Sequence, residues 1–415
     1  MIRVKGNNLG GKVRAIASKS YAHRAIIGAA LADGKSKIKF FESSEDIETT
    51  LAAIIALGAE VNRVEDGVEI TPISKRDSTP VVDASESGTT LRMMLPVAAA
   101  LYDQFRFRGR GRLRERPIIE LMNAMEPMGV SFDSHTLPFE CTGKLRSGKF
   151  VIPGNISSQY ISGLLFATPL LDQASEIELT TKLESKAYVK MTLEILEKFG
   201  ISIETTESGY KIEPQKFKPI DYLVEGDWSN ASFFLVAGAL GSEVTVEGLN
   251  INSIQGDKEI LEILTRAGAI VTTEDGAVTV KRGELVPFDA DLSEIPDMLP
   301  ILAVVAAAVE KGVSTFYNGK RLRLKESDRL KSTADMIRAL GGELEETEDG
   351  LIIYGTDGLN GGTTDSQGDH RIAMAAAIAS VVSRDVVYIK NHEAVSKSYP
   401  GFFKDFRMLG GEAFE

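Results

Sequence analysis

The feature that most constrains the fold is a helix end that recurs about every seventy residues. Apolar residues at helical spacing stop at a glycine six times, at Gly58, Gly129, Gly200, Gly268, Gly341 and Gly410. Successive glycines are 71, 71, 68, 73 and 69 residues apart. A glycine directly after the last apolar turn is typical of a helix C-terminal cap, and the β-branched or acidic residues after it favour a strand. The chain is therefore expected to consist of six copies of one supersecondary unit.

Each period also holds an alanine-rich segment that is apolar nearly all round, which predicts a buried helix. These segments are AIIGAALA, LPVAAALY, ISGLLFATPLL, ASFFLVAGAL, LPILAVVAAAV and IAMAAAIASVV. Strand-like segments such as SKIKFF and SEVTVEGL flank them, and hairpin-like segments such as AEVNRVEDGVEI close the period. Every unit thus reads strand, buried helix, strand, amphipathic helix and hairpin.

Six units divide into two sets of three, so we expect two domains. The first is predicted over 14–222, and the second is discontinuous, over 1–13 and 223–415. The last unit has only five residues after Gly410, too few for its closing hairpin. The first strand, IRVKG over 2–6, is the piece of chain that could complete it.

Composition narrows the class of protein. The chain has 415 residues with 47 Lys and Arg against 59 Asp and Glu, a net charge of −12, which disfavours a general binder of nucleic acids or anionic membranes. A single cysteine, Cys141, excludes an internal disulfide and a cysteine-based zinc cluster. The start MIRVKGNNLGGK has no apolar core of a signal peptide, and the most apolar stretch, 295–309, is too short to span a bilayer. We expect a cytoplasmic, multidomain protein.

Polar clusters occur where helices are predicted to begin. SKS (18–20), SGTT (87–90), SSQ (157–159) and GDHR (368–371) precede buried helices, whereas KESDR (325–329) and SKS (396–398) are expected to open amphipathic ones. Ordinary N-capping explains Ser, Thr and Asp at such places. It does not explain cations, which oppose the helix dipole there. The cations in or beside these starts are Lys19, Arg24, Arg92, Lys325, Arg329, Arg371 and Lys397. Their repetition indicates bound anions.

Two carboxylates, Asp297 in SEIPDM and Glu326 in KESDR, lie in the same places. A carboxylate among cations is often only a salt-bridge partner. The alternative is general acid–base work on a bound anionic substrate, and the residues themselves leave both readings open.

Nine motifs in this order resemble the 5-enolpyruvylshikimate-3-phosphate synthase family: SKSYAHRA, SGTTLR, RERP, SSQY, SKAYVKMT, IPDM, KESDRL, GDHRIAMA and SKSYPGF. The resemblance runs from about Lys12 to Phe406. It implies a mixed α/β fold of two inverse α/β barrels (an alpha-beta prism), each domain holding three βαβαββ repeats, with the active site in the cleft between the domains. The repeat count reached from the glycines agrees with this.

The resemblance also implies a reaction in the shikimate pathway, the condensation of shikimate 3-phosphate with phosphoenolpyruvate without a cofactor or metal, in an enzyme that is a glyphosate target. Carried over by motif, shikimate 3-phosphate would be bound by Lys19, Ser20, Arg24, Ser157, Ser158, Gln159, Ser185, Tyr188, Asp297 and Lys325. Phosphoenolpyruvate would be bound by Lys19, Gly88, Arg116, Gln159, Arg329, Arg371 and Lys397.

The mechanism expected from the resemblance is addition followed by elimination. Protonation of the phosphoenolpyruvate methylene makes C2 cationic, the 5-hydroxyl of shikimate 3-phosphate attacks it, and the tetrahedral adduct loses phosphate. Asp297 is assigned to the 5-hydroxyl as base, and Glu326 or Lys19 to proton transfer at the methylene.

Two positions depart from the family pattern. Glu86 stands where the family usually has Asn, and Arg321 stands where it often has Asn, so Arg321 is not included in the expected site.

Two other functions compete with this assignment. The related transferase acting on UDP-N-acetylglucosamine typically has a loop Cys and a Lys-Asn pair, whereas this chain has Lys19-Ser20. A non-enzymatic RNA-binding repeat protein is the second alternative, suggested by the six arginines of RFRGRGRLRER (106–116), although their alternation more simply predicts a strand with one charged face. The four histidines have no metal-ligand spacing, and we expect a monomer without nucleic-acid or membrane partners.

Overall fold

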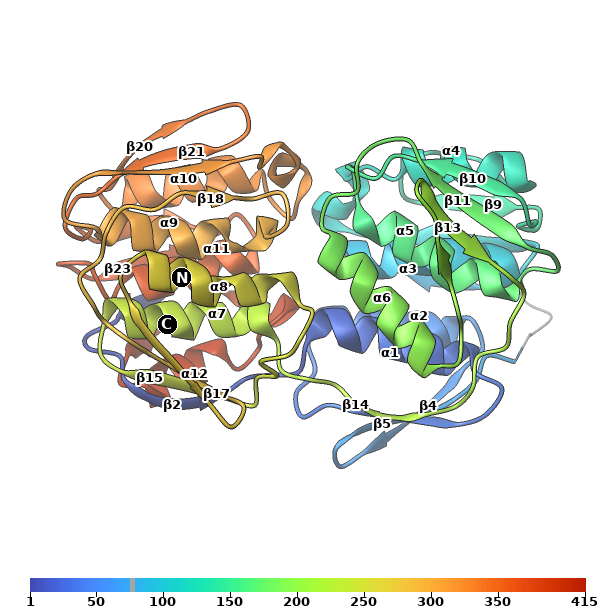
Figure 1. The fold of residues 1–415 in the computed structure, drawn as a ribbon, viewed down its shortest axis with the longest axis horizontal. Helices are drawn as coiled ribbons and strands as arrows, with labels where there is room; N and C mark the ends of the chain where they lie inside the picture. Colours follow the sequence, from blue (N-terminus) through green and yellow to red (C-terminus); the bar gives the residue numbers. More distant parts are fainter. Residues whose placement is uncertain (75–78) are drawn as a thin grey trace. The chain divides into compact units, whose positions relative to one another are not determined.

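The computed structural model describes residues 1–74 and 79–415, and the chain in these ranges forms two compact units (Figure 1). The N-terminal unit is Lys19–Val224, and the C-terminal unit is Met1–Ser18 together with Glu225–Glu415. These boundaries differ from the predicted ones at 14 and 222. Residues up to Ser18 stay with the C-terminal unit because the Ser18 N–H donates to the Glu225 carbonyl and Ala17 bridges to Gly226.

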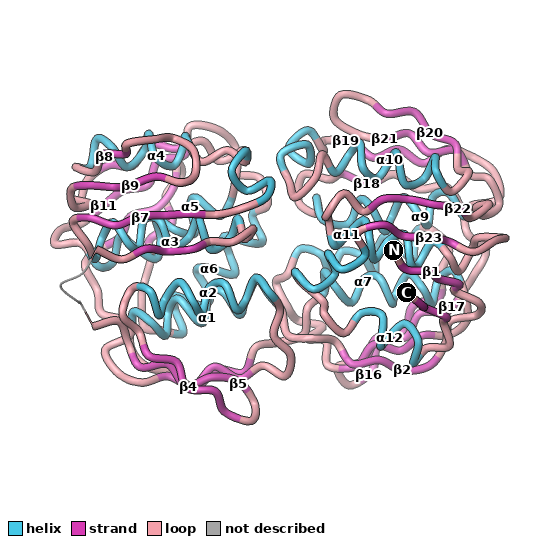
Figure 2. Tube along the Cα trace, turned by 180° about the vertical axis from the view of Figure 1, so that it is seen from behind, coloured by secondary structure: helices cyan, strands magenta, loops and turns pink. Residues whose placement is uncertain are grey.

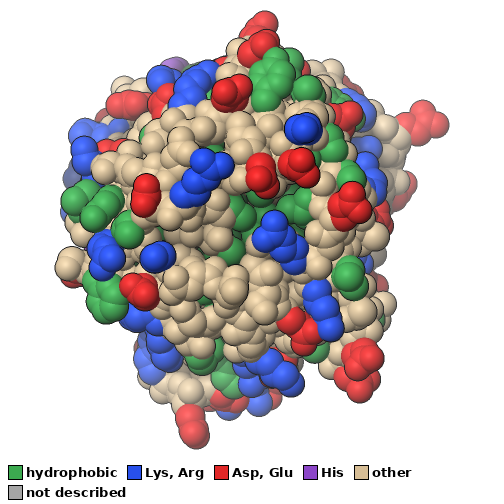
Figure 3. Space-filling view, turned by 90° about the vertical axis from the view of Figure 1, so that its left-hand side faces the viewer, with side chains coloured by type: hydrophobic (Ala, Val, Ile, Leu, Met, Phe, Trp, Pro, Cys, Tyr) green, Lys and Arg blue, Asp and Glu red, His purple; other side chains and the backbone are tan. Residues whose placement is uncertain are grey.

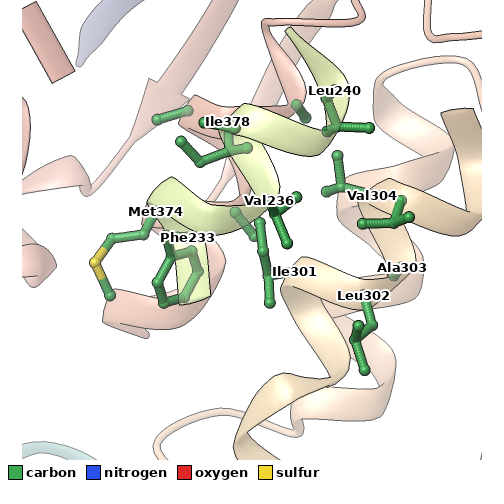
Figure 4. Packing of buried hydrophobic residues seen from close by; sticks show 14 of the residues in the cluster. Phe233, Val236, Leu240, Ile301, Leu302, Ala303, Val304, Met374 and Ile378 are labelled. Carbon is green, nitrogen blue, oxygen red and sulfur yellow. The ribbon is translucent and has the colours of Figure 1, made fainter. Parts of the chain in front are cut away.

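Six long, buried helices form the centre of the two units, as the alanine-rich segments predict. They are α1 (Lys19–Leu31), α3 (Gly88–Leu101), α5 (Ser158–Ala167), α7 (Trp228–Leu240), α9 (Leu299–Ala308) and α11 (His370–Ala379). Small side chains let these helices approach closely: a Cβ on Gly163 of α5 would lie 2.5 Å from the Arg92 carbonyl of α3. Figure 4 shows side chains of α7, α9 and α11 packed on one another, among them Val236, Ile301 and Ile378. Burying each such side chain contributes about 1.5–3 kcal/mol.

A second, more amphipathic helix follows in each repeat. These helices are α2 (Glu45–Ala56), α4 (Ile119–Met125), α6 (Lys186–Lys198), α8 (Ile260–Arg266), α10 (Arg329–Ala339) and α12 (Phe402–Met408). The six glycines that follow them all have a positive φ, between 78° and 105°. Only glycine adopts this conformation without strain, so the predicted helix ends are confirmed.

Four-stranded sheets flank the helices of each unit (Figure 2). In the N-terminal unit, one sheet has the strand order β14 (Asp221–Leu223), β3 (Ser36–Lys39), β5 (Gly67–Thr71), β4 (Glu60–Val64). Another has the order β6 (Val81–Asp83), β7 (Gln104–Arg108), β9 (Phe139–Thr142), β8 (Ser131–Phe132). A further sheet has the order β10 (Lys149–Ile152), β11 (Ser175–Leu179), β13 (Gly209–Ile212), β12 (Glu204–Thr205). In the C-terminal unit, one sheet has the strand order β16 (Ile270–Glu274), β17 (Ala277–Lys281), β15 (Val244–Glu247), β2 (Gly11–Arg14). Another has the order β18 (Ala290–Asp291), β19 (Val313–Tyr317), β21 (Leu351–Tyr354), β20 (Glu343–Glu346). A further sheet has the order β22 (Gly362–Asp365), β23 (Val387–Lys390), β1 (Ile2–Lys5), β24 (Glu412–Phe414).

The first strand of the chain completes the last repeat, as the sequence predicts. Strand β1 lies between β23 and β24 and is antiparallel to both, with Val4 opposite Val387 and Ala413. Without β1 the short strand β24 would have no neighbour in this sheet. The mixed α/β fold built of strand–helix–strand–helix–hairpin repeats is therefore present.

Candidate active site

The first cluster of polar residues lies at the start of α1 in the N-terminal unit. Lys19 is the first residue of this helix, and its Nζ lies 2.8 Å from Oδ2 of Asp46, in the first turn of α2. Both side chains are only 16% exposed, so each is held close to the other. Sequence reasoning missed Asp46, although the acidic run ESSED marks a helix start at which such a residue is stabilised by the dipole.

Arg24 joins α1, to which it belongs, to α6. Its buried guanidinium donates from Nε to the Thr192 hydroxyl at 2.8 Å, from Nη1 to the Ser20 carbonyl at 2.7 Å and from Nη2 to the Tyr188 carbonyl at 2.9 Å. Burial lowers the pKa of Arg24 to about 10, opposed by Tyr188 and Tyr21, so the side chain stays cationic at neutral pH. The predicted residues Ser20, Arg24 and Tyr188 are thereby brought together.

Gln159 is fixed at the start of α5. The Ser157 hydroxyl caps this helix by accepting from the Gln159 N–H at 3.3 Å. The Gln159 Oε1 atom accepts from Arg92 Nη1 at 2.9 Å, and its Nε2 donates to the Thr89 hydroxyl at 2.7 Å. Arg92 is one of the cations at helix starts in the sequence but is not among the predicted site residues, and the structure places it against Gln159.

Gly88 and Arg116 meet at the start of α3. Gly88 is the first residue of this helix, after the capping Ser87. A Cβ on Gly88 would lie 2.8 Å from Arg116 Nη1, so the guanidinium rests directly against the glycine. Arg116 is only 9% exposed. The structure thus pairs two residues that the sequence could only place in separate motifs.

The remaining predicted residues of this unit lie at two helix starts. Ser158 is the buried first residue of α5. Ser185 is buried directly before α6 and has a left-handed backbone, with φ of 52°.

A buried ionic cluster dominates the C-terminal unit. Arg329, the first residue of α10, has a side chain that is 1% exposed. Its Nη1 lies 2.6 Å from Oδ1 of Asp297, in the 3-10 turn Pro296–Met298, and its Nη2 lies 2.5 Å from Oε2 of Glu326. The two carboxylates proposed for acid–base work therefore share one guanidinium.

Cations hold Asp297 in its ionised form. Burial by itself would raise the pKa of Asp297, but Arg371, Lys325 and Arg329 outweigh it and hold the pKa well below its usual value. Arg371 Nη2 lies 3.4 Å from Oδ2 of Asp297, and Lys325 Nζ lies 3.5 Å from Oδ1. Burial lowers the pKa of Lys325 to about 8, although Asp297 opposes the shift.

Lys397 lies outside the helix that it was expected to open. SKS (396–398) overlaps the 3-10 turn His392–Lys397, and α12 begins only at Phe402, so this expectation is wrong. Pro400 disfavours a helical backbone in the residue before it, which delays the helix. The KESDR motif, by contrast, does lie at the start of its helix, because the Asp328 side chain caps α10 by accepting a hydrogen bond from the Lys331 N–H. The Lys397 ammonium donates to the Gly368 carbonyl at 2.8 Å, which places it beside the GDHR motif.

Two buried carboxyl groups of this unit were not anticipated. Asp369, within GDHR, accepts hydrogen bonds from Arg329 and was read from sequence only as part of a motif. Asp257 is 4% exposed, and burial followed by repulsion from Asp297 raises its pKa to about 6. Neither has a sequence signal beyond its type, because burial and partners depend on chain segments far apart in sequence.

Several other expectations concern residues away from these clusters. Strand β7 has the predicted charged face, and Arg106 and Arg108 pair across it with Glu140 and Asp83. The strand ends at Arg108, and Gly111–Glu115 form a 3-10 turn, so the expectation of a strand over 106–116 is wrong beyond Arg108. Lys and Arg are intermingled with Asp and Glu on the face of the molecule shown in Figure 3. Cys141 is buried in β9.

The two departures from the family pattern make contacts of their own. The Glu86 carboxylate lies against Gly111, where a Cβ would be 2.7 Å from Oε1. Arg321 donates to the Ser293 carbonyl.

Among residues 1–74 and 79–415, no three His, Cys, Asp or Glu side chains are grouped so as to hold a metal ion. No helix in these ranges has both the length and the apolar character needed to cross a membrane.

Comparisons with known proteins give one result throughout. The sequence model of the EPSP synthase family, 3-phosphoshikimate 1-carboxyvinyltransferase, matches residues 4–406. A 3-phosphoshikimate 1-carboxyvinyltransferase of Clostridium perfringens is 43% identical over 412 residues, covering 98% of this chain and 97% of the relative. A Clostridioides difficile protein of the same name is 40% identical, covering 100% and 98%.

Solved structures match over the same length. EPSP synthase from Acinetobacter baumannii has a TM-score of 0.83 at 25% identity, covering 100% of this chain and 99% of that one. The enolpyruvyl transferase NikO from Streptomyces tendae has a TM-score of 0.80 at 17% identity, covering 100% and 98%, which supports the fold alone.

Proposed function

This chain belongs to the EPSP synthase family, and on that premise we propose that the polar clusters of its two units serve one reaction. The activity is enolpyruvyl transfer: the enolpyruvyl group of phosphoenolpyruvate passes to the 5-hydroxyl of shikimate 3-phosphate and phosphate is released, in the shikimate pathway of aromatic amino-acid biosynthesis. Transfer to UDP-N-acetylglucosamine is not favoured, because the curated relatives that match nearly the whole chain are named for the shikimate reaction.

The proposed binding residues follow the clusters. In the N-terminal unit, Arg24 fixes the Ser20 and Tyr188 backbones, and Arg92 fixes Gln159, so a rigid polar surface is prepared for shikimate 3-phosphate. Arg116 at the α3 start is proposed for phosphoenolpyruvate. The two substrates together carry about six negative charges, taking each phosphate as about −2. Such charge requires many cations, and arginine forks match carboxylate and phosphate groups with two hydrogen bonds each.

The proposed base is Asp297. Arg329, Lys325 and Arg371 surround it, so it is ionised at neutral pH and can accept a proton. In the addition step, the O–H bond of the substrate 5-hydroxyl breaks as its oxygen bonds to C2 of phosphoenolpyruvate, and the proton passes to Asp297. The low basicity of Asp297 suits a step in which the attacked carbon is already cationic.

Proton transfer at the methylene is proposed for Glu326 or Lys19. The acid gives a proton to C3 of phosphoenolpyruvate, which forms a methyl group and leaves C2 electron-poor. After addition, the same group removes a methyl proton while the C–O bond to phosphate breaks, which restores the double bond in the product. Glu326 is supported by its contact with Arg329, which also contacts the proposed base.

The observation that carries these assignments is the sharing of Arg329 by Asp297 and Glu326. The test measures phosphate release with both substrates and with each omitted, for the wild-type enzyme and for Asp297→Asn. Asp335→Asn is the matched control, since Asp335 pairs with Lys331 on the exposed side of α10 and accepts a hydrogen bond from Gln367. We expect release that needs both substrates, a loss of at least about 100-fold for Asp297→Asn and near wild-type turnover for the control. Near wild-type turnover of Asp297→Asn with substrate binding intact would remove Asp297 from the base role.

We also propose that the enzyme works as a cytoplasmic monomer without a cofactor or a nucleic-acid partner. The absence of a cofactor is supported by the chemistry, because the two substrates supply every atom of the products and no electrons are exchanged. Light scattering of the purified protein tests the monomer, and dialysis against a chelator before assay tests independence from metal.

A further inference from the structure

Asp369 is a carboxylate beside the proposed site whose two oxygens accept four hydrogen bonds. It is fully buried, with 0% exposure, directly before α11. Its Oδ2 accepts from Arg329 Nε at 2.9 Å and from the Ser327 hydroxyl at 3.0 Å. Its Oδ1 accepts from Arg329 Nη2 at 3.2 Å and from the Arg371 backbone N–H at 2.9 Å. Helix capping explains only the last of these four bonds.

The hydrogen bonds from Nε and Nη2 of Arg329 to the two carboxylate oxygens of Asp369 form a bidentate pair, the fork, which holds the guanidinium in one orientation. A guanidinium held at two atoms by one carboxylate cannot rotate without losing both bonds. Its outer N–H groups then point in set directions, and two of them reach Asp297 and Glu326. The positions of both proposed acid–base groups therefore depend on the orientation of one buried arginine.

Charge gives Asp369 a second effect. Arg329, Lys325 and Arg371 face Asp297, Glu326 and Asp369 in this cluster. Asp257, Arg321 and His370 act on the same groups, Asp257 through Asp297 and Arg371, Arg321 through Lys325, and His370 with Nδ1 3.9 Å from Asp369 Oδ1. Removal of the charge of Asp369 makes this cluster more positive by one charge. An excess positive charge lowers the pKa of every neighbouring acid, Lys325 included.

We propose that Asp369 is a positioning residue for the enolpyruvyl transfer, which acts by orienting Arg329 so that this arginine sets the placement and ionisation of Asp297 and Glu326. The inference rests on the proposed roles of these two carboxylates. Asp369 itself acts through the protein, since its carboxylate accepts hydrogen bonds from Arg329, Ser327 and Arg371 and lies 3.9 Å from the His370 imidazole.

The test compares Asp369→Asn with Asp328→Asn as a matched control. Asp328 also caps a helix in the same unit and accepts two hydrogen bonds from one arginine, Arg323, but it lies outside the cluster. Asn keeps the size of Asp369 and can still cap α11. We expect Asp369→Asn to lower kcat by at least about 100-fold, while the Kd for shikimate 3-phosphate changes by less than about threefold. The control is expected to keep kcat within about threefold of the wild type.

A pH profile separates positioning from a general loss of structure. The alkaline limb of kcat/KM for shikimate 3-phosphate is expected near the pKa of Lys325, about 8. In Asp369→Asn this limb should move to lower pH by about one unit, because one negative charge has left the cluster. An unmoved limb together with a kcat close to that of Asp328→Asn would overturn the proposal.

A second pair of variants covers the case in which Asp369→Asn folds poorly. Arg329→Lys keeps the positive charge but cannot form the fork, so it should lose at least as much kcat as Asp369→Asn, and the double variant should be no worse than Arg329→Lys alone. Losses that multiply would contradict the shared role. If the wild-type enzyme released no phosphate, the proposed function would fail. NMR titrations of the Asp297 and Glu326 carboxyl groups would still test whether Asp369 positions Arg329. Lower pKa values of these two groups in Asp369→Asn would support the proposal, and unchanged pKa values would refute it.

Discussion

Replacement of Gly88 by alanine should weaken the binding of phosphoenolpyruvate without unfolding the enzyme. The new Cβ would lie 2.8 Å from Nη1 of Arg116 and 2.9 Å from its Cζ and Nη2. Ordinary contacts between such atoms are about 3.5 Å, so the guanidinium must move by about 0.6 Å or more. It can move because it is the end of a long side chain, and alanine suits the first turn of α3 as well as glycine does.

The size of the effect follows from what Arg116 is proposed to do. Hydrogen bonds to a charged group contribute about 1.5–3 kcal/mol, and every 1.4 kcal/mol is about tenfold in affinity. Displacement of the fork from a substrate carboxylate or phosphate should therefore raise the KM for phosphoenolpyruvate by about 10- to 100-fold. The Kd for shikimate 3-phosphate and the melting temperature should stay close to wild type.

A double-mutant cycle with Arg116→Ala is the assay that isolates this route. Initial rates of phosphate release give the KM for phosphoenolpyruvate in Gly88→Ala, Arg116→Ala and the combination. If the methyl group acts only by displacing Arg116, the double variant should match Arg116→Ala within about twofold. The reasoning is refuted if Gly88→Ala multiplies the KM by the same factor in both backgrounds, or if it leaves the wild-type KM unchanged.

Three further predictions concern ionisation. Because burial lowers the pKa of Lys325 to about 8, kcat/KM for shikimate 3-phosphate should fall as the pH rises past 8, and Lys325→Arg should move this fall to higher pH. Burial, followed by Lys19 and Arg24, holds the pKa of His23 well below 6.5, so the unfolded chain takes up a proton below about pH 6.5 that the folded chain does not. Stability should therefore fall with decreasing pH, and in denaturant titrations His23→Gln should show a dependence shallower by about 1.4 kcal/mol per pH unit. Burial raises the pKa of the Cys141 thiol to about 12, so a reagent that labels thiols by disulfide exchange should react with Cys141 only after denaturation. Rapid labelling of the native protein at pH 8 would contradict this prediction.

Much of the architecture was determined by the sequence itself. The six capping glycines and the alanine-rich segments predicted every buried helix, since a helix that is apolar all round has only one stable environment and a left-handed cap is nearly specific to glycine. The missing hairpin after Gly410 also identified the partner of the first strand, because an unpaired strand edge is costly. The motifs named the family.

The exact boundary between the two units required the tertiary structure, although the sequence already predicted that the second is discontinuous. Strand β2 pairs with β15, with Val13 opposite Val246, and this pairing keeps residues up to Ser18 in the C-terminal unit. Local propensity cannot show it, because both strands satisfy the same pattern with any neighbour of matching register.

Within the site, the sequence determined which side chains are present, and the tertiary structure decided which of them touch. Asp297, Arg329 and Asp369 come from segments 32 and 40 residues apart, and their bonds exist only when α9, α10 and α11 are packed. Motifs therefore pointed to Asp297 and Arg329 but gave Asp369 no role. The strength of an ion pair and the pKa of a carboxylate depend on distance and burial, which are properties of the packed chain and not of the order of its residues.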